Sequence, residues 1–170
     1  EEKYYAAGKI KGSKWIKRES RPSDEAILSG RVIDRAIRPR FNHNIRNEVQ
    51  VVATVLSFDA INDPDMVALF GASLALMVSD IPFDGPIAEV RVGRVEGKFI
   101  INPTYAELEH SDMDIIVAGT ADSLVMVEGS ATEISESDMI AALKVGHEAI
   151  GAICAVQVEL AKALTVQKRL

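Results

Sequence analysis

The chain has 170 residues, of which 48% are apolar and 26% are charged, and it carries a net charge of -6. This is the usual mixture of a globular domain, and it excludes collagen, coiled coil and wholesale disorder. Charges or glycines interrupt every apolar run before about 18 residues, so we expect no membrane contact. The single Cys154 excludes an internal disulfide. With no signal-like start, it favours a reducing, cytoplasmic location.

The charge is distributed unevenly along the chain. Residues 1–46 hold 12 of the 19 Lys and Arg and only 6 of the 25 acids, so this segment is +6 and the remainder is -12. A basic lobe on an acidic body indicates a polyanionic partner better than the net charge does. The alternative is that these cations only solvate a surface.

Turn residues and hydrophobic periodicity divide the chain into strands and helices. Ser23 is a good N-cap for a helix that ends at Pro39, with Asp24 and Glu25 in its first turn. Ser135 begins a long helix at about 136–168, which runs to the end of the chain. The other expected elements are strands at 3–7 and 48–58, a helix at 65–79, and hairpins formed by 87–95 with 98–101 and by 112–118 with 124–128. This order favours an α+β fold.

The loop between residues 8 and 21 is strongly basic. Cations contact phosphates, and the aromatic ring of Trp15 offers a stacking surface to any base of a nucleic acid. The alternative is that Trp15 and Ile16 anchor the loop to the core. The six cations of the loop are Lys9, Lys11, Lys14, Lys17, Arg18 and Arg21.

The helix at 23–38 carries a second set of cations. Arg31, Arg35 and Arg38 share one helical face, where only Asp34 opposes them. Arginine presents a planar fork that fits phosphate oxygens, so this face favours an anionic ligand. A solvated face with internal ion pairs is the alternative.

Other polar residues give weaker signals. Asp112 and Asp114 alternate on an expected strand and would share a face, where they could bind Mg²⁺ or simply be solvated. The histidines lack metal-ligand spacing, and Cys154 lies on the apolar side of the last helix as an inert core thiol.

A series of short motifs resembles the first core domain of the bacterial polynucleotide phosphorylase (polyribonucleotide nucleotidyltransferase) family. The match covers nearly the whole chain in order, which makes it specific although each motif is short. The motifs include Ala7-Gly8-Lys9-Ile10, Lys17-Arg18-Glu19-Ser20-Arg21-Pro22-Ser23, Ile33-Asp34-Arg35-Ala36-Ile37-Arg38-Pro39, Asn62-Asp63-Pro64-Asp65, Gly85-Pro86-Ile87, Val117-Ala118-Gly119-Thr120 and Gly146-His147-Glu148.

The resemblance implies a fold and an activity. The fold is RNase PH-like, of the ribosomal protein S5 domain 2 type, with a mixed sheet packed against helices. Residues 1–170 would form a single partial core domain whose N-terminal strands are missing. The activity is 3′-to-5′ degradation of RNA by phosphate, which releases nucleoside diphosphates. Two cores occupy one chain in this family, and three chains form a homotrimer ring. The resemblance leaves room for further RNA-degradation partners.

The resemblance also assigns roles to residues. Trp15, Ile16, Lys17 and Arg18 match the loop that grips RNA in the channel, and Arg21 follows that loop. Ile16 replaces one of the family's two aromatics. Arg31, Arg35 and Arg38 match arginines of an RNA or anion track.

The catalytic positions of the family differ in this chain. Asp63 and Asp65 stand where serines hold the attacking phosphate, and aspartates would repel it. Asp114 matches a catalytic Asp, but Ile116 replaces a Lys and Leu108 replaces a second Asp. The resemblance therefore implies a non-catalytic segment, with Asp114 as its only catalytic candidate and with Mg²⁺ or Mn²⁺ and inorganic phosphate on a second core.

Two alternatives remain open at this stage. One is a non-catalytic RNA-binding scaffold subunit of an exosome-like ring. The other is a catalytically competent domain that uses Asp112, Asp114 and Glu109.

Overall fold

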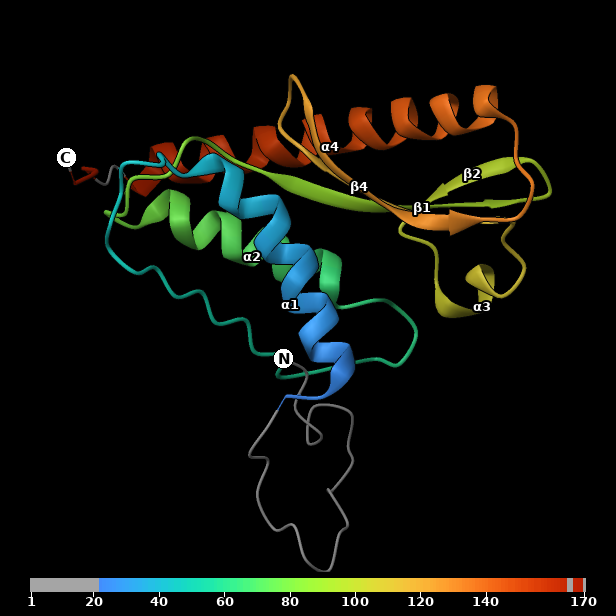
Figure 1. The fold of residues 1–170 in the computed structure, drawn as a ribbon, viewed down its shortest axis with the longest axis horizontal. Helices are drawn as coiled ribbons and strands as arrows, with labels where there is room; N and C mark the ends of the chain where they lie inside the picture. Colours follow the sequence, from blue (N-terminus) through green and yellow to red (C-terminus); the bar gives the residue numbers. More distant parts are fainter. Residues whose placement is uncertain (1–21, 165–166, 170) are drawn as a thin grey trace, which may run out of the picture.

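A computed structural model describes residues 22–164 and 167–169 as helices packed on both faces of one sheet (Figure 1). The sheet order is β2-β1-β3-β4, and every described strand pairs antiparallel with its neighbour, where a mixed sheet was expected. The elements are α1 (Asp24–Ile37), a 3₁₀ turn η1 (Arg38–Arg40), α2 (Asp65–Val78), β1 (Ala88–Val95), β2 (Lys98–Ile101), α3 (Tyr105–Leu108), β3 (Met113–Gly119), β4 (Leu124–Ala131) and α4 (Glu136–Leu164).

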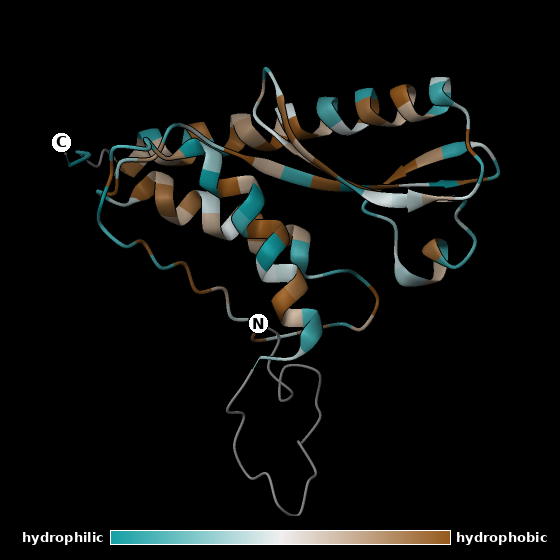
Figure 2. Ribbon diagram, viewed as in Figure 1, coloured by the Kyte–Doolittle hydropathy of each residue, from teal (hydrophilic) through white to brown (hydrophobic). Residues whose placement is uncertain are grey.

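Two hydrophobic cores lie on opposite faces of the sheet. One joins alternate residues of β1 and β3, such as Val90, Val92 and Val117, to the inner side of α4. The other joins residues such as Ala118 of β3 to α1 and α2. The period of two along a strand accounts for this division, because neighbouring residues point to opposite faces. Figure 2 shows the corresponding apolar stripes on the helices.

Helix α1 begins as the sequence predicts. The backbone N–H of Ala26 donates to the Ser23 side chain at 3.1 Å, which satisfies one of the free donors of the first turn. Ala36 and Ile37 are buried at its end, where it becomes the 3₁₀ turn. The helix therefore has an apolar inner side and a charged outer side.

Helix α4 lies close to the sheet because Gly146 has no side chain. A Cβ at this position would lie 3.2 Å from a methyl carbon of Val92, tighter than an ordinary contact. Within the described ranges, α4 is the one helix long and apolar enough to cross a membrane. Ala142, Ile150 and Cys154 are buried along its inner side, which packs against β1 and β3.

The segment after α4 is fastened to the end of α2. The Lys168 ammonium donates to the carbonyls of Leu76, Met77 and Ser79 at 2.7, 3.0 and 2.7 Å. Arg169 forms an ion pair with Asp80. Free carbonyls at a helix C-terminus attract cations, so Lys168 satisfies groups that the helix itself leaves unpaired.

Residues 48–58 do not form the strand that their β-branched composition predicts. Val55 makes one isolated bridge, and the segment runs beside α2 without joining the sheet (Figure 1). Val52 is 74% exposed and Leu56 is 72% exposed. A strand requires a hydrogen-bonding neighbour, and none of the described strands lies beside this segment.

Two smaller differences concern helix ends. Helix α3 was not predicted, and in it Thr104 and Glu107 form a reciprocal capping box. Helix α4 ends at Leu164 in the described residues, and 167–169 are not helical. The strand expected at 3–7 lies outside the described residues.

Candidate functional site

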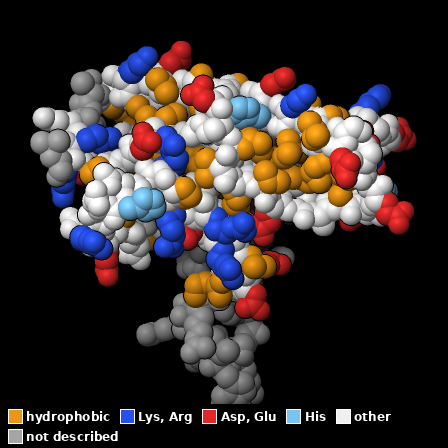
Figure 3. Space-filling model, turned by 45° about the horizontal axis from the view of Figure 1, so that its top comes forward, with side chains coloured by type: hydrophobic (Ala, Val, Ile, Leu, Met, Phe, Trp, Pro, Cys, Tyr) orange, Lys and Arg blue, Asp and Glu red, His pale blue; other side chains and the backbone are white. Residues whose placement is uncertain are grey.

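The arginines of α1 lie on the outer surface of the molecule. Arg31, Arg35 and Arg38 are all exposed, and Figure 3 shows Lys and Arg side chains gathered over this helix. Arg38 bonds Asp34 one turn earlier, at 2.6 and 3.0 Å. Arg35 forms an ion pair with Glu128 of β4. Arg31 has no acidic partner among the residues that the structure describes, so this face keeps less spare charge than expected.

The remaining predicted RNA contacts lie outside the described residues. The structure therefore leaves their roles as predictions. They are Trp15, Ile16, Lys17, Arg18 and Arg21.

A central arginine brings Asp63 and Asp114 together. Arg91 bonds both carboxylate oxygens of Asp114, at 2.6 and 2.8 Å, and also pairs with Asp63. Arg91 lies opposite Ile116 in the sheet, so Asp114 is its diagonal neighbour on the same face. Asp63 precedes α2 and accepts a hydrogen bond from the backbone N–H of Asp65 at 2.9 Å. Asp63 and Asp114 thus share one cation.

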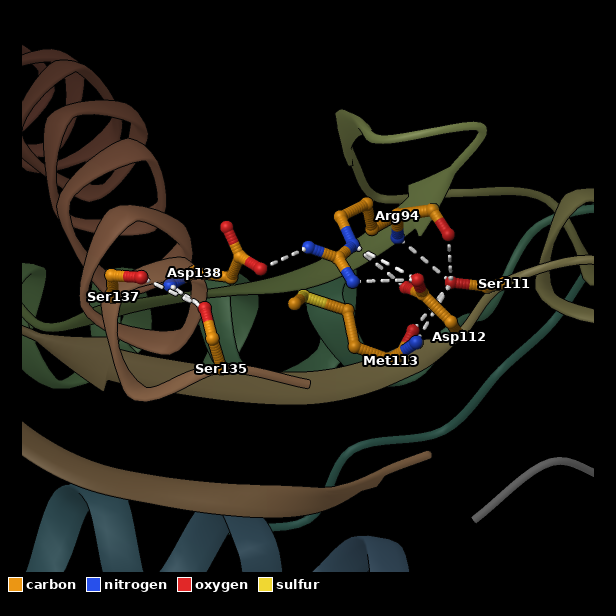
Figure 4. Close-up of polar contacts among 7 residues, drawn as sticks. All are labelled: Arg94, Ser111, Asp112, Met113, Ser135, Ser137 and Asp138. Carbon is orange, nitrogen blue, oxygen red and sulfur yellow. Dashed lines mark hydrogen bonds and ion pairs between the residues drawn. The ribbon is translucent and has the colours of Figure 1, made fainter. Parts of the chain in front are cut away.

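A second arginine fastens the other end of the sheet to α4. The Arg94 guanidinium lies between the carboxylates of Asp112 and Asp138, with contacts of 2.7 and 2.8 Å (Figure 4). Hydrogen bonds from Arg94 lower the pKa of both carboxyl groups. Ser135 accepts from the backbone N–H of Asp138 and so begins α4 as predicted. The cluster joins β1, the start of β3 and the start of α4.

Asp112 and Asp114 do not share a face, contrary to the expectation from their spacing. Asp114 reaches Arg91 on the side of α2, and Asp112 reaches Arg94 on the side of α4. Strand β3 begins only at Met113, so Asp112 precedes it and is not held to the alternation of a strand. Each carboxylate therefore forms an ion pair with a different arginine, and the two carboxylates are not placed to bind one metal ion together.

The described part of the chain offers no metal site. No group of three His, Cys, Asp or Glu side chains in these ranges is placed to hold a metal ion. An arginine already occupies the carboxylates nearest to such a role. The residues at this position therefore do not fit Mg²⁺ or Mn²⁺, which would need those oxygens free.

Glu89 is the most deeply buried acid that the structure describes. It is 2% exposed, and neither carboxylate oxygen has a hydrogen-bond partner in the described residues. Burial, with smaller contributions from the charges of Asp65 and Asp63, raises its pKa to about 8. Burial also raises the pKa of Asp65. The carboxyl of Glu89 is therefore protonated at neutral pH.

Glu89, Arg91 and Arg94 were not predicted as site residues. A signal was present, because three charges interrupt an otherwise apolar strand and two of them alternate on one face. A charge inside a buried strand needs a partner of opposite sign, which sequence spacing alone does not identify.

Two pockets include Asn62 and Asp63 in their lining. The larger is a groove of about 600 Å³ between residues 51–59 and the small-residue side of α2. The smaller measures about 210 Å³ and is lined by Asn62, Asp63, Arg91 and Asn102 with apolar neighbours. The smaller pocket borders the paired charges of Asp63 and Arg91.

Two further side chains have structural roles, and the buried position predicted for Cys154 is confirmed. The His147 ring lies 3.1 Å from the carbonyl oxygen of Thr120, and so ties α4 to the β3–β4 turn. Cys154 is 1% exposed, and burial raises the pKa of its thiol, which makes it an inert core residue.

Comparison with known proteins places this fold in a class. Residues 1–82 match the model of the 3′ exoribonuclease family, domain 1, and residues 85–149 match domain 2 of the same family. The division falls between α2 and β1. Helices on an antiparallel sheet, with these two matches, define an α+β protein of the RNase PH type.

The chain belongs to the 3′ exoribonuclease family. It is similar to proteins named polyribonucleotide nucleotidyltransferase, as its motifs indicated. It is 54% identical over 169 residues to the protein of Geotalea daltonii, and 54% identical over 168 residues to those of Anoxybacillus flavithermus and Bacillus velezensis. Each comparison covers 99% of this chain and 24% of the relative, so the chain spans about a quarter of their length.

Proposed function

We propose that this chain is the RNA-guiding first core of a polyribonucleotide nucleotidyltransferase, which degrades RNA from its 3′ end by phosphorolysis. The observation that carries the proposal is the exposed arginine face of α1, which follows directly on the basic segment 8–21. An extended polyanion is the ligand that such a continuous series of cations fits best. The names of the relatives support the same substrate.

The proposed role is guiding rather than catalytic. Phosphoryl transfer needs cations and hydrogen-bond donors that are free to meet the charge on phosphorus. The guanidinium of Arg91 is held by Asp63 and Asp114, and that of Arg94 by Asp112 and Asp138. Both arginines therefore hold the fold together, and Asp114 acts as a structural partner of Arg91.

The proposal implies a division of labour with other parts of the protein. The metal ion, Mg²⁺ or Mn²⁺, and the inorganic phosphate would bind a second core. A homotrimer ring in the cytoplasm would hold RNA between the cores. Single-stranded RNA would contact Trp15, Lys17 and Arg18 first and the arginines of α1 next.

The first experiment is phosphate-dependent release of nucleoside diphosphate from poly(A) with Mg²⁺. We expect the intact natural protein to release nucleoside diphosphate and the 170-residue chain alone to release none. Activity of the chain alone would overturn the guiding role and make the carboxylates around Asp114 catalytic candidates.

The second experiment changes Lys17 and Arg18 to Ala in the intact protein. We expect weaker and less processive RNA degradation, with an unchanged rate on a dinucleotide substrate too short to reach the loop. Because phosphate contacts release counterions, the variant should also show a shallower dependence of RNA affinity on salt. Unchanged affinity and processivity on long RNA would contradict the proposal.

A further inference from the structure

Glu89 is a buried acid whose carboxyl group has no hydrogen-bond partner in the described residues. It lies on β1, on the same face as Arg91, and this face packs against α2. Its side chain is almost fully buried, and neither carboxylate oxygen accepts or donates a hydrogen bond to a described residue. Burying an unpaired carboxylate is costly, whereas the protonated acid carries no charge.

The groups around Glu89 are mostly of its own sign. Asp65, in the first turn of α2, and Asp63, which precedes that helix, both act on it through their charges. From α1, the Ser29 side chain lowers the pKa of Asp65, although its hydroxyl donates to the carbonyl of Glu25 at 3.0 Å. The nearest cation on its own strand, Arg91, is already paired with Asp63 and Asp114.

Ionisation of Glu89 would add a negative charge beside Asp63, Asp65 and Arg91. A third carboxylate at this place would repel Asp63 and Asp65 across a poorly screened interior. It would also compete with Asp63 for Arg91, two residues away on the same face. Both effects push the amino end of α2 away from β1, since Asp63 and Asp65 are the residues that hold the charge there.

We propose that Glu89 is a proton-controlled latch that holds the amino end of α2 against β1. With its proton bound, the loop 59–64 and the first turn of α2 remain packed on the sheet. When the proton leaves, Asp63 exchanges Arg91 for solvent, and this segment opens. The switch is a property of the fold and does not depend on the proposed RNA-guiding role.

The direction of the pH dependence follows from linkage. The pKa of Glu89 is about 8 in the folded protein and 4.5 when exposed, so the closed state holds a proton that the open state releases. Opening therefore becomes more favourable as the pH rises from about 4.5 to 8 and changes no further above that. In the steep part of this window, the opening constant rises by up to about tenfold per pH unit.

The test is hydrogen exchange of peptides covering residues 59–69 in the intact natural protein between pH 6 and 9. Rates are divided by the intrinsic exchange rate at each pH. We expect the normalised rate to rise with pH up to about 8 and then to level off. Peptides covering β2 should show no such pH dependence, because this strand pairs with the far end of β1 and does not face Glu89.

The decisive variant is Glu89→Gln, which keeps the shape and cannot lose a proton. We expect its normalised exchange at 59–69 to be independent of pH, while the matched control Glu159→Gln, at an exposed position on α4, behaves like the wild type. The same pH dependence in Glu89→Gln and in the wild type would overturn the proposal.

A second variant keeps the proposal testable if Glu89→Gln does not fold. Asp65→Asn removes one of the charges that oppose ionisation of Glu89, so the levelling-off should move to lower pH. An unchanged pH for the levelling-off would count against the latch.

Discussion

The arginines of the sheet and the arginines of α1 meet their acids in different surroundings. The Arg94 side chain is 14% exposed and lies between two carboxylates, whereas that of Arg38 is 76% exposed and holds one. An exposed ion pair contributes about 0–1 kcal/mol, because water and salt screen it. A charge left alone in a protected site costs far more.

The difference separates residues that hold the fold from residues free to meet a ligand. Arg91 and Arg94 each neutralise two acids, so neither can leave both of them without leaving an uncompensated charge in a partly buried site. Arg35 and Arg38 can exchange a surface acid for a phosphate at little cost, and Arg31 has no acid to exchange in the described ranges. Arginine thus has two roles in this molecule. Where it is buried it stabilises the fold, and where it is exposed it is available to a ligand.

The largest expected effect is on folding stability, from Arg91→Ala. The change leaves Asp63 and Asp114 facing each other without a cation, and we expect the free energy of unfolding to fall by about 3 kcal/mol. Urea denaturation measures this loss. Adding Asp63→Asn and Asp114→Asn should recover part of it. A loss no larger than that of the exposed control Arg38→Ala would break the comparison.

The next largest effect is the loss at acid pH of the stability that Arg94 gives through its ion pairs with Asp112 and Asp138. Arg94 lowers the pKa of Asp112 and Asp138, so the stability that it adds is present above the ordinary carboxyl pKa of 3.8 and is lost as the pH falls below it. We expect Arg94→Met to reduce the thermal midpoint by a few degrees at pH 7. At pH 3 the two proteins should differ much less. An equal difference at both values would assign the effect to packing rather than charge.

A smaller effect, on RNA alone, is expected from Arg31→Ala. This arginine has no acidic partner in the described ranges, so its loss should leave the unfolding midpoint unchanged. RNA affinity should fall, and the slope of log affinity against log salt should become shallower by about one unit. Fluorescence anisotropy with a labelled oligoadenylate measures both quantities. Arg38→Ala, which also frees Asp34, is the matched comparison.

The smallest expected effect is a gain in RNA affinity. Glu128→Gln releases Arg35 from its ion pair, so we expect RNA affinity to rise a few-fold at low salt and to converge with the wild type at high salt. The same binding assay at two salt concentrations checks it. A decrease in affinity would mean that Glu128 orients Arg35 for RNA instead of competing with it.

Local signals in the sequence predicted much of the fold. The Ser23 cap, both hairpins and the start of α4 depend on residues close together in the chain, and the structure confirms them. The prediction for 48–58 failed for a different reason. A run of β-branched residues shows that a segment can be extended, but only a neighbouring strand makes it part of a sheet.

The site was predictable in part. The α1 arginines follow from helical spacing, and the structure confirms that they are exposed. The pairing of Arg91 with Asp63 and Asp114 joins residues 28 and 23 positions apart. It depends on sheet register and on where α2 begins. Neither can be read from composition, so the arginine that neutralises the acids was missed.

The attachment of Lys168 to the end of α2 has a mechanical consequence. A force that pulls on the chain at residues 167–169 is transmitted first to the carbonyls of Leu76, Met77 and Ser79, and so to α2. The force therefore does not act first on the C-terminal end of α4, where it would pull this helix away from the sheet. A domain joined after residues 167–169 would therefore transmit its motion to α2. Helix α2 would transmit that motion in turn to the loop that contains Asp63.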